Sequence, residues 1–391
     1  MDLQSITVLD LSRLLPGPYA THLLAEMGAD VVKVEAPNGG DYARYAEPTV
    51  DGDYGAMFAA INQGKESITL DLKSDEGREA FLRLAAEADV VFEQFRPGVV
   101  DRLGIGYDDV EERNPDVIYC SLSGYGQSGP YSDRVGHDLN YAGFAGLLDM
   151  TRRDEEERPR ITGYPVGDMA GGVFSALSIV GALLGRELGN TGGNYLDVSM
   201  TDAVLSFSQA VGSLANAGED PRPGETNLTG LYPCYDIYET SNGRHLTLAA
   251  LEPKFWENLC AAIDRPELVD KHQSDDPAVR RAVRDELREV FGSRSLAEWE
   301  ADLGEQEVMI GKVNTPREAL DDPHLRNRGV VDADGEGFPR IGYPAEVHHG
   351  LSGGGGQAPG LGEQTSDVLR RFGFEAAEID ALFDSGAVEG S

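Results

Sequence analysis

Short apolar runs alternate with longer amphipathic stretches along the first third of the chain. The strand-like runs are residues 5–12, 29–37, 89–95 and 116–126. Residues 20–27 and 74–88 instead repeat their apolar positions at the spacing of one helix face. Strands that alternate with helices predict βαβ units, and therefore an α/β fold with a parallel sheet covered on both faces.

Ligands of such sheets bind beyond the carboxyl ends of the strands. The turns that follow Leu9, Val34, Phe95 and Ser121 are therefore where we expect the chemistry of this protein.

The pattern changes near the middle of the chain. Residues 186–229 are irregular and include a polar stretch rich in glycine and proline at 216–227. A strand-rich stretch begins at Leu231 and contains the hairpin signal Ser241-Asn242-Gly243, and helices are predicted at 253–263 and 275–291. This order predicts a second domain of α+β type.

The predicted organisation has a Rossmann-like large domain, a linker and a small domain. Residues 1–200 form the large domain, 201–224 the linker and 225–328 the small domain. A glycine-rich stretch at 350–362 precedes a predicted helix at 364–372, so we expect residues 330–391 to return to the large domain.

Acidic residues dominate the charge of the chain, with 68 Asp and Glu against 33 Lys and Arg and a formal net charge of −35. A surface this acidic repels nucleic acids and anionic membranes, so neither is an expected partner. Only six of the basic residues are lysines, a balance typical of proteins in a high-salt cytoplasm, where salt screens the repulsion. An ordinary acidic protein is the alternative.

The cysteines and the apolar segments indicate a cytoplasmic protein. The three cysteines are far apart and form no CxxC pair, which argues against disulfides and a zinc site. The N-terminus lacks the pattern of a signal peptide. The apolar stretch 171–185 is shorter than the ~20 residues of a membrane span and is expected to be a buried helix.

Three common catalytic motifs are absent, namely GxxxxGK[ST], HExxH and GxSxG. Polar residues instead stand out in apolar or glycine-rich surroundings at 95–106, 135–148, 164–185 and 248–256. Each segment is weak by itself. A single histidine such as His137 is more often structural than catalytic, and an aspartate before a helix, such as Asp168, is usually an N-cap.

Together with the N-terminal stretch, these segments resemble the family III CoA-transferase superfamily. VLDLSRLLPGPYATHLLAEMGADVVKVEAPNGGD, FRPGVVDRLGIG and SLSGYGQSGP follow the superfamily's order, and the resemblance covers roughly residues 3–350. It implies an interlocked homodimer in which each chain threads through the ring of the other. The active site would then lie where the large domain of one protomer meets the small domain of its partner.

Three shorter stretches resemble the α-methylacyl-CoA racemase branch, namely 136–141 (GHDLNY), 167–172 (GDMAGG) and 251–255 (LEPKF). The resemblance implies that His137 and Asp168 exchange the α-proton on the two faces of the substrate and that Glu252 supports the histidine. In the transferase branch, the aspartate matching Asp168 is instead a nucleophile that forms an acyl anhydride. That branch does not typically keep the His-Asp-x-Asn-Tyr stretch, so His137 discriminates between the two.

Inversion of the carbon beside a thioester needs a base on one face and an acid on the other. Histidine has a suitable pKa, whereas aspartate needs burial to raise its own. The enolate intermediate needs hydrogen-bond donors. If Asp168 begins a helix, the N–H groups of the first turn are the expected donors.

The resemblance also implies residues that bind the acyl-CoA. Lys73 and Arg102 match phosphate-binding positions, although both also fit ordinary surface cations, and Arg96 has either a turn role or a nucleotide contact. Asp138 and Tyr141 match substrate-contacting positions, and either alternatively holds the local loop. Racemases of this type can carry a basic residue where this chain has Ala36, which is a departure from the pattern.

The leading hypothesis is therefore a racemase that inverts the α-carbon of a 2-methylacyl-CoA through an enolate, with no metal or redox cofactor and with CoA as part of the substrate. The alternative is transfer of CoA to a free carboxylic acid through Asp168. A third hypothesis is a CoA-thioester binding protein without catalysis.

Overall fold

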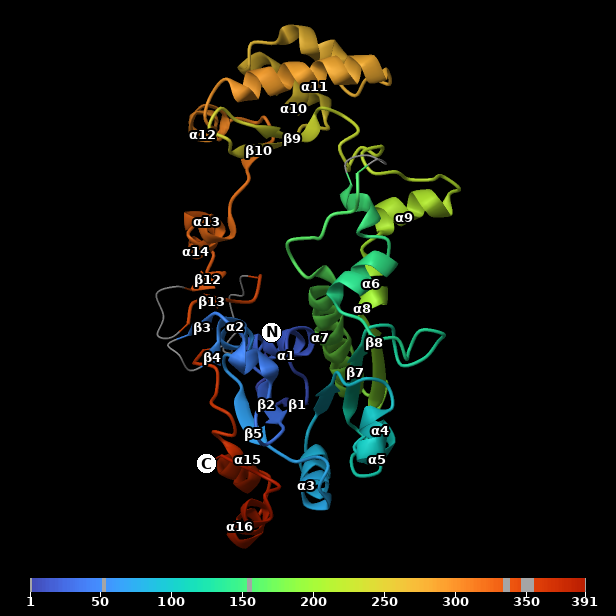
Figure 1. Ribbon diagram of the computed structural model, residues 1–391, viewed down its shortest axis with the longest axis vertical. Coiled ribbons are helices and arrows are strands. Elements are labelled where there is room, and N and C mark those ends of the chain that lie inside the picture. Colours follow the sequence, from blue (N-terminus) through green and yellow to red (C-terminus); the bar gives the residue numbers. More distant parts are fainter. Residues whose placement is uncertain (1, 51–53, 153–156, 333–337, 346–354, 391) are drawn as a thin grey trace. The chain divides into compact units, whose positions relative to one another are not determined.

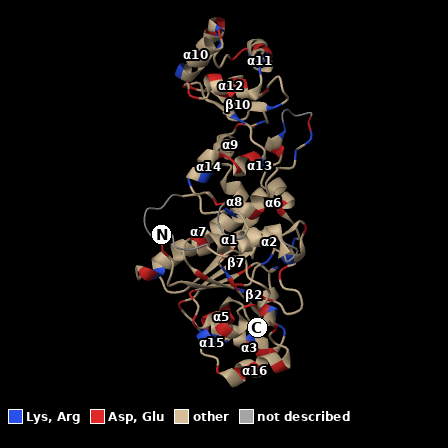
Figure 2. Ribbon diagram, turned by 90° about the vertical axis from the view of Figure 1, so that its left-hand side faces the viewer, with Lys and Arg blue, Asp and Glu red and all other residues tan. Residues whose placement is uncertain are grey.

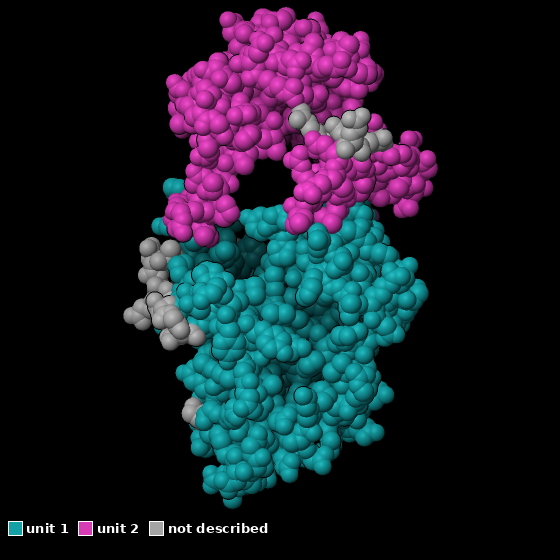
Figure 3. Space-filling model, in the orientation of Figure 1, with its two compact units in different colours: residues 1–147, 162–208, 323–391 teal, residues 148–161, 209–322 magenta. Residues whose placement is uncertain are grey.

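A computed structural model describes residues 2–50, 54–152, 157–332, 338–345 and 355–390 (Figure 1). Asp and Glu residues are spread over elements throughout the chain (Figure 2). The chain divides into two compact units (Figure 3). Unit 1 comprises Met1–Leu147, Thr162–Ser208 and Pro323–Ser391, and unit 2 comprises Leu148–Ile161 and Gln209–Asp322.

Unit 1 is built on a six-stranded sheet in which every neighbouring pair of strands is parallel. Its strands, in spatial order, are β5 (Glu66–Thr69), β2 (Asp30–Glu35), β1 (Thr7–Asp10), β6 (Val90–Glu93), β7 (Ile118–Ser123) and β8 (Asn194–Ser199). Counted within the sheet, this is the 3-2-1-4-5-6 order of the Rossmann fold. The order reverses between β1 and β6, and ligands of such sheets bind at this reversal, outside the carboxyl ends of the strands.

Helices cover both faces of the sheet because successive strand residues point to opposite faces. Val8 packs with α1 (Pro16–Glu26) and α7 (Val166–Glu187), whereas its neighbour Leu9 packs with α3 (Asp75–Ala85) and with α15 (Thr365–Arg371) on the other face. The predicted α/β fold with a covered parallel sheet is therefore confirmed.

Two strands of the sheet are missing from the sequence prediction. β5 has only four residues, ESIT, three of which are polar. β8 lies at the edge of the sheet with exposed residues at its start, so its sequence NYLDVS lacks the continuous apolar run of the central strands. Its range falls inside the stretch that the sequence analysis treats as irregular.

The other elements of unit 1 are short or lie at the ends of its segments. They are η1 (Tyr42–Tyr45), β3 (Thr49–Val50), β4 (Tyr54–Gly55), α2 (Ala56–Ile61), α4 (Val99–Leu103), α5 (Tyr107–Glu111), α6 (Asp138–Phe144), α8 (Met200–Ser206), α14 (Pro323–Asn327), β12 (Val331–Asp332), β13 (Arg340–Ile341) and α16 (Ala376–Ser385).

Unit 2 has its own core around an antiparallel three-stranded sheet in the order β11 (Ile310–Lys312), β10 (His245–Ala249) and β9 (Tyr235–Glu239). The predicted hairpin turn joins β9 to β10, and Gly243 adopts a φ of 72° there, a conformation that favours glycine. Its helical elements are η2 (Asp149–Thr151), α9 (Gln209–Asn216), α10 (Pro253–Ala262), η3 (Pro266–Lys271), α11 (Pro277–Gly292), α12 (Leu296–Leu303) and α13 (Pro316–Leu320).

The observed units differ from the predicted domains in three places, one of which is residues 323–328, predicted in the small domain and assigned to unit 1. The predicted linker 201–224 contains most of α8 in unit 1 and the whole of α9 in unit 2. Residues 148–161, placed in the large domain by the sequence analysis, are assigned to unit 2.

The apolar stretch predicted at 171–185 forms the middle of α7. By length and composition alone this helix is long and apolar enough to cross a membrane. In the structure it packs against α1, α8 and the strands β7 and β8, and Ala176, Ile179 and Leu183 are buried there. The side of α7 that bears these three residues therefore belongs to the core of unit 1.

Candidate active site

His137 immediately precedes α6, in the stretch GHDLNY at 136–141. The side chain of Asn140 reaches back to accept a hydrogen bond from the His137 backbone N–H at 3.0 Å. The Tyr141 hydroxyl donates to the carbonyl of Gly136 at 2.5 Å, and a side chain at position 136 would lie 2.8 Å from the Tyr141 ring. These contacts fix the loop around His137, whose own side chain is exposed.

Asp138 connects this loop to the beginning of α7. Its Oδ1 atom accepts hydrogen bonds from the backbone N–H groups of Gly167, at 2.6 Å, and of Asp168, at 3.2 Å. These are two of the N–H groups that a helix N-terminus leaves without a partner in its own helix. Asp138 therefore holds the first turn of α7 next to the beginning of α6, and brings Asp168 close to His137.

Asp168 lies in the first turn of α7, on a partly buried side chain. Burial raises the pKa of its carboxyl group to about 6, and the nearby Asp138 carboxylate acts in the same direction, whereas His137 opposes the shift. A carboxyl group with this pKa exchanges a proton near neutral pH. The N-cap of the helix is Pro165, so the alternative in which Asp168 is only an N-cap is wrong.

Three of the predicted donors for an enolate already have hydrogen-bond partners within the chain. The N–H groups of Gly167 and Asp168 donate to Asp138, and that of Met169 donates to the Pro165 carbonyl at 3.0 Å. A role of the first-turn N–H groups toward an enolate oxygen therefore stays a prediction. The sequence could not show the bonds to Asp138 because this partner comes from 30 residues earlier in the chain.

Two glycines after Asp168 allow α7 to approach its neighbours closely. A side chain at Gly172 would lie 2.8 Å from the Pro16 carbonyl oxygen in α1, and one at Gly171 would lie 2.6 Å from the Met200 side chain. The sequence GDMAGG thus fixes the position of the helix that bears Asp168.

The structure brings together only part of the predicted site. His137, Asp138, Tyr141 and Asp168 lie together in unit 1, whereas Glu252 is the exposed N-cap residue of α10 in unit 2. Tyr141 is buried, and its hydroxyl group is bonded within the loop. The geometry therefore supports the alternative in which Tyr141 holds the local loop.

A pocket of about 650 Å³ opens at the carboxyl edge of the sheet, between the loops that follow β1, β2, β5 and β6. Lys73 and Arg96 line it, together with Ala36. A smaller pocket of about 310 Å³ shares Arg96 and is also lined by Arg102. The three cations predicted to bind CoA thus lie around one region, at the reversal of strand order where the fold places ligands.

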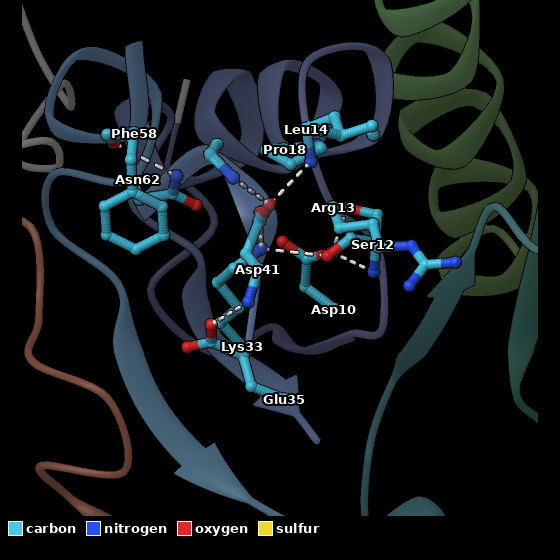
Figure 4. Close-up of polar contacts among 12 residues, drawn as sticks. Asp10, Ser12, Arg13, Leu14, Pro18, Lys33, Glu35, Asp41, Phe58 and Asn62 are labelled. Carbon is cyan, nitrogen blue, oxygen red and sulfur yellow. Dashed lines mark hydrogen bonds and ion pairs between the residues drawn. The ribbon is translucent and has the colours of Figure 1, made fainter. Parts of the chain in front are cut away.

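A buried network of charged groups supports the loops around the larger pocket (Figure 4). Lys65 contacts Asp10 at 3.2 Å and Lys33 contacts Asp41 at 3.0 Å, and all four side chains are fully buried. Burial alone would raise the pKa of Asp10, but the ammonium groups of Lys65 and Lys33 lower it to about 2. The Asp10 carboxylate therefore stays ionised at neutral pH.

Asp41 also fixes the backbone of the loop that follows β1. Its Oδ1 atom accepts a hydrogen bond from the N–H of Leu14 at 2.9 Å (Figure 4). Leu14 has a φ of 66°, a left-handed conformation that is uncommon for leucine. The network thus holds one wall of the pocket in a strained conformation.

Two features of this region are missing from the sequence prediction. The first is the bridging role of Asp138, because the hydrogen bonds to Gly167 and Asp168 depend on how α6 and α7 pack. The second is Arg13, which lines the same pocket as Lys73. Its position directly after a predicted strand was the available signal.

Relatives with known names match nearly the whole chain. A succinyl-CoA:mesaconate CoA-transferase of Haloarcula hispanica is 38% identical over 95% of this chain and 96% of its own length. An alpha-methylacyl-CoA racemase of Homo sapiens is 32% identical over 100% of both chains. An acetyl-CoA:oxalate CoA-transferase of Acetobacter aceti is 32% identical over 94% of this chain and 95% of its own.

Solved structures share the fold as well. A CAIB/BAIF family protein from Brucella suis superimposes with a TM-score of 0.83 at 29% identity, over 95% of this chain and 99% of its own. The Rv3272 protein from Mycobacterium tuberculosis gives a TM-score of 0.80 at 30% identity, over 94% and 98% of the two chains. The family model described as CoA-transferase family III matches residues 3–365, and the chain belongs to this family.

Proposed function

We propose that this protein is a racemase that inverts the α-carbon of a 2-methylacyl-CoA, with His137 and Asp168 as its acid/base pair. The observation behind this proposal is the junction of α6 and α7, where Asp138 holds the first turn of α7 beside His137. The raised pKa of Asp168, about 6, matches the second proton-transfer group that the reaction needs.

The proposed reaction moves one proton at each face of the α-carbon. One residue of the pair removes the α-proton, the electron pair moves into the thioester carbonyl to form an enolate, and the other residue adds a proton to the opposite face. A single residue would return the proton to the side that it left. CoA is part of the substrate, and the proposal requires no metal or redox cofactor.

Glu252 has a supporting role in this proposal. A carboxylate that accepts a hydrogen bond from an imidazole raises the basicity of the ring and fixes its orientation. Because His137 and Glu252 belong to different units, the proposal leaves open whether Glu252 acts within its own chain or across a dimer.

Transfer of CoA between an acyl-CoA and a free carboxylic acid is the second candidate. The 38% identity to a succinyl-CoA:mesaconate CoA-transferase favours it, because the racemase relative is only 32% identical. In this reaction the Asp168 carboxylate attacks the thioester carbonyl, CoA leaves as a thiolate, and an acyl anhydride forms on Asp168. Asp168 serves both candidates, whereas His137 is required only by the first.

Deuterium exchange at C2 separates the two candidates. The wild-type protein, incubated with a 2-methylacyl-CoA in deuterium oxide and no acceptor acid, should incorporate deuterium at C2. His137→Ala should lower the exchange rate by about 10²-fold or more, the effect of removing an acid/base group. His137→Gln, which keeps a polar side chain of similar size, controls for loss of local structure.

The opposite result would support the transferase. If no exchange occurs over a panel of acyl-CoAs, the racemase proposal is wrong. Hydroxylamine trapping of an acyl group on Asp168, detected by mass spectrometry and retained in His137→Ala, would then identify CoA transfer.

We also propose that the protein acts as a homodimer. One side of α7 presents Val173, Leu177 and Leu184, and the C-cap residue Leu188 follows them; all four are between 40% and 65% exposed in the single chain. A continuous apolar stripe of this kind is typical of an interface. Leu177→Asp should give a monomer in light scattering, whereas Leu320→Asp, at an exposed leucine of α13, should leave the dimer intact.

Hybrid dimers test the origin of Glu252. A mixture of His137→Ala and Glu252→Ala chains contains one intact site per hybrid only if Glu252 acts across the dimer. Recovered exchange activity would therefore place Glu252 in the partner's site, and its absence would place Glu252 in the same chain as its histidine.

The acidic surface and the small number of lysines support a high-salt cytoplasm as the location of this enzyme. We therefore propose that the enzyme acts in such a cytoplasm.

A further inference from the structure

We propose that Arg13 is a specificity residue that binds a phosphate group of the CoA nucleotide. The inference rests on the proposed function, because it takes a CoA thioester to be the ligand. Arg13 follows β1, at the reversal of strand order, and lines the pocket of about 650 Å³ together with Lys73 and Arg96. These three cations come from the loops after three different strands.

Hydrogen bonds on both sides of Arg13 fix its backbone. The Lys33 ammonium donates to the Ser12 carbonyl at 2.8 Å, and the N–H of Leu14 donates to Asp41. The carbonyl of Arg13 itself accepts from the Gln94 side chain at 2.8 Å. The side chain is exposed and leads away from the buried network (Figure 4). A fixed backbone thus presents a long cationic side chain to the pocket.

Tyr42 limits the orientations of this side chain. The Arg13 guanidinium lies 5.0 Å from the centroid of the Tyr42 ring, within the range of a cation–π contact, and Tyr42 lines the same pocket. Arginine binds phosphate oxygens through the planar fork of N–H groups of its guanidinium.

The charges around the pocket leave Arg13 uncompensated. Within the described part of the chain, neither Arg13 nor Lys73 has a carboxylate at ion-pair distance. Two of the three acidic residues of the pocket wall are paired with other cations, since Glu35 binds Arg44 at 2.6 Å and Asp41 binds Lys33. The third, Asp71, accepts a hydrogen bond from the backbone N–H of Lys73 at 3.1 Å. In a protein with a net charge of −35, this local positive charge indicates a binding region for an anion.

CoA offers two kinds of phosphate to such a pocket, the diphosphate and the 3′-phosphate. Both present oxygen atoms to a guanidinium in the same way, so the contact alone does not separate them. Dephospho-CoA lacks only the 3′-phosphate, and pantetheine lacks the whole nucleotide. A comparison of these ligands identifies the phosphate that Arg13 binds.

The test measures the dissociation constant of CoA and the KM and kcat of the acyl-CoA for wild type, Arg13→Ala and Arg13→Lys. Arg13→Ala should raise the dissociation constant and KM about tenfold with little change in kcat, and Arg13→Lys should recover part of the loss. Arg78→Ala, at a surface arginine paired with Asp75, is the matched control and should change neither value.

The ligand series locates the contact. If Arg13 binds the 3′-phosphate, the defect of Arg13→Ala should disappear with dephospho-CoA. If it binds the diphosphate, the defect should persist with dephospho-CoA and disappear with the acyl-pantetheine.

Two negative results have different meanings. Equal affinity of folded Arg13→Ala and wild type for CoA would overturn the role of Arg13 alone. Failure of the wild-type protein to bind CoA would instead contradict the proposed function.

Discussion

His137 is left available because its neighbours are bonded to one another. The Asn140 side chain accepts a hydrogen bond within the loop and the Tyr141 hydroxyl donates one. The Asp138 carboxylate accepts hydrogen bonds from the first turn of α7. Among the described residues, no side chain or carbonyl group forms a hydrogen bond with the His137 imidazole. The stretch GHDLNY therefore holds its own backbone in place and leaves the His137 imidazole available to a substrate.

Asp138→Asn should lower the pKa of Asp168. The substitution keeps an oxygen acceptor for the Gly167 and Asp168 N–H groups but removes the negative charge that raises this pKa. The limb of the pH profile of kcat/KM that belongs to Asp168 should move to lower pH by a fraction of a unit to about one unit. Glu111→Gln, at an exposed position of α5, is the control, and an unchanged limb would contradict the role of Asp138.

Asp168→Asn should stabilise the folded protein above pH 6. The folded-state pKa of Asp168, about 6, lies above the ordinary value of 3.8, so the folded protein holds a proton that the unfolded chain loses between these values. The free energy of unfolding therefore falls as pH rises through this window. Asp168→Asn should raise the free energy of unfolding at pH 8 by up to about 2 kcal/mol. This gain is smaller than the full pKa shift implies, because the side chain is only partly buried.

Thermal unfolding at several pH values checks this expectation. The gain should vanish near pH 4, where Asp168 is protonated in the folded protein. Asp380→Asn, at an exposed position of α16, should give no such pH-dependent gain. A gain of equal size at both pH values would refute the ionisation argument.

The sequence was sufficient to select His137 and Asp168 as candidates, but not to find their connection. The resemblance made Asp138 a candidate substrate contact or loop residue, but its hydrogen bonds to residues 167 and 168 depend on tertiary packing. The function of Arg13 was hidden for a similar reason. One arginine after a strand is ordinary, and its lack of a carboxylate partner is visible only when the surrounding loops are placed.

At the scale of elements, α7 carries the catalytic candidate Asp168 in its first turn and packs closely against α1 at Gly172. Gly172→Ala should destabilise the protein by roughly 1–3 kcal/mol, because the new methyl group would lie 2.8 Å from the backbone oxygen of Pro16. It should also reduce catalysis by displacing Asp168.

Gly292→Ala is the matched control for this substitution. Gly292 is the last residue of α11, and a side chain there meets no atom within 4 Å among the described residues. The melting temperature of Gly292→Ala should equal that of wild type or exceed it slightly, because alanine favours a helix more than glycine does. Equal melting temperatures for Gly172→Ala and wild type would show that α1 and α7 adjust to the methyl group.

The elements that the sequence predicted well are the buried ones. The runs that became β1, β2, β6 and β7 are buried along almost their whole length because helices cover both of their sides, and each contains at least two adjacent apolar residues. The edge strand β8 is exposed at its start and contains polar residues, so local pattern alone did not distinguish it from a loop. Its pairing with β7 depends on a partner more than 70 residues away.

At the scale of the whole molecule, the net charge of −35 predicts that stability depends on salt. Lowering KCl from about 1 M to about 0.1 M lengthens the screening distance from about 3 Å to about 10 Å, which strengthens repulsion between the carboxylates. The melting temperature should therefore fall at low salt, as measured by circular dichroism. An unchanged melting temperature would contradict adaptation to a high-salt cytoplasm.

The return of the C-terminal segment to unit 1 has a consequence for synthesis on the ribosome. Val368 and Leu369 of α15 belong to the same core as Leu9 and Val32 near the N-terminus. The nascent large unit therefore lacks part of its core until nearly all 391 residues have been translated. Unit 2 is contained within the chain and can complete its own core earlier, so it is expected to fold before the unit whose synthesis began first.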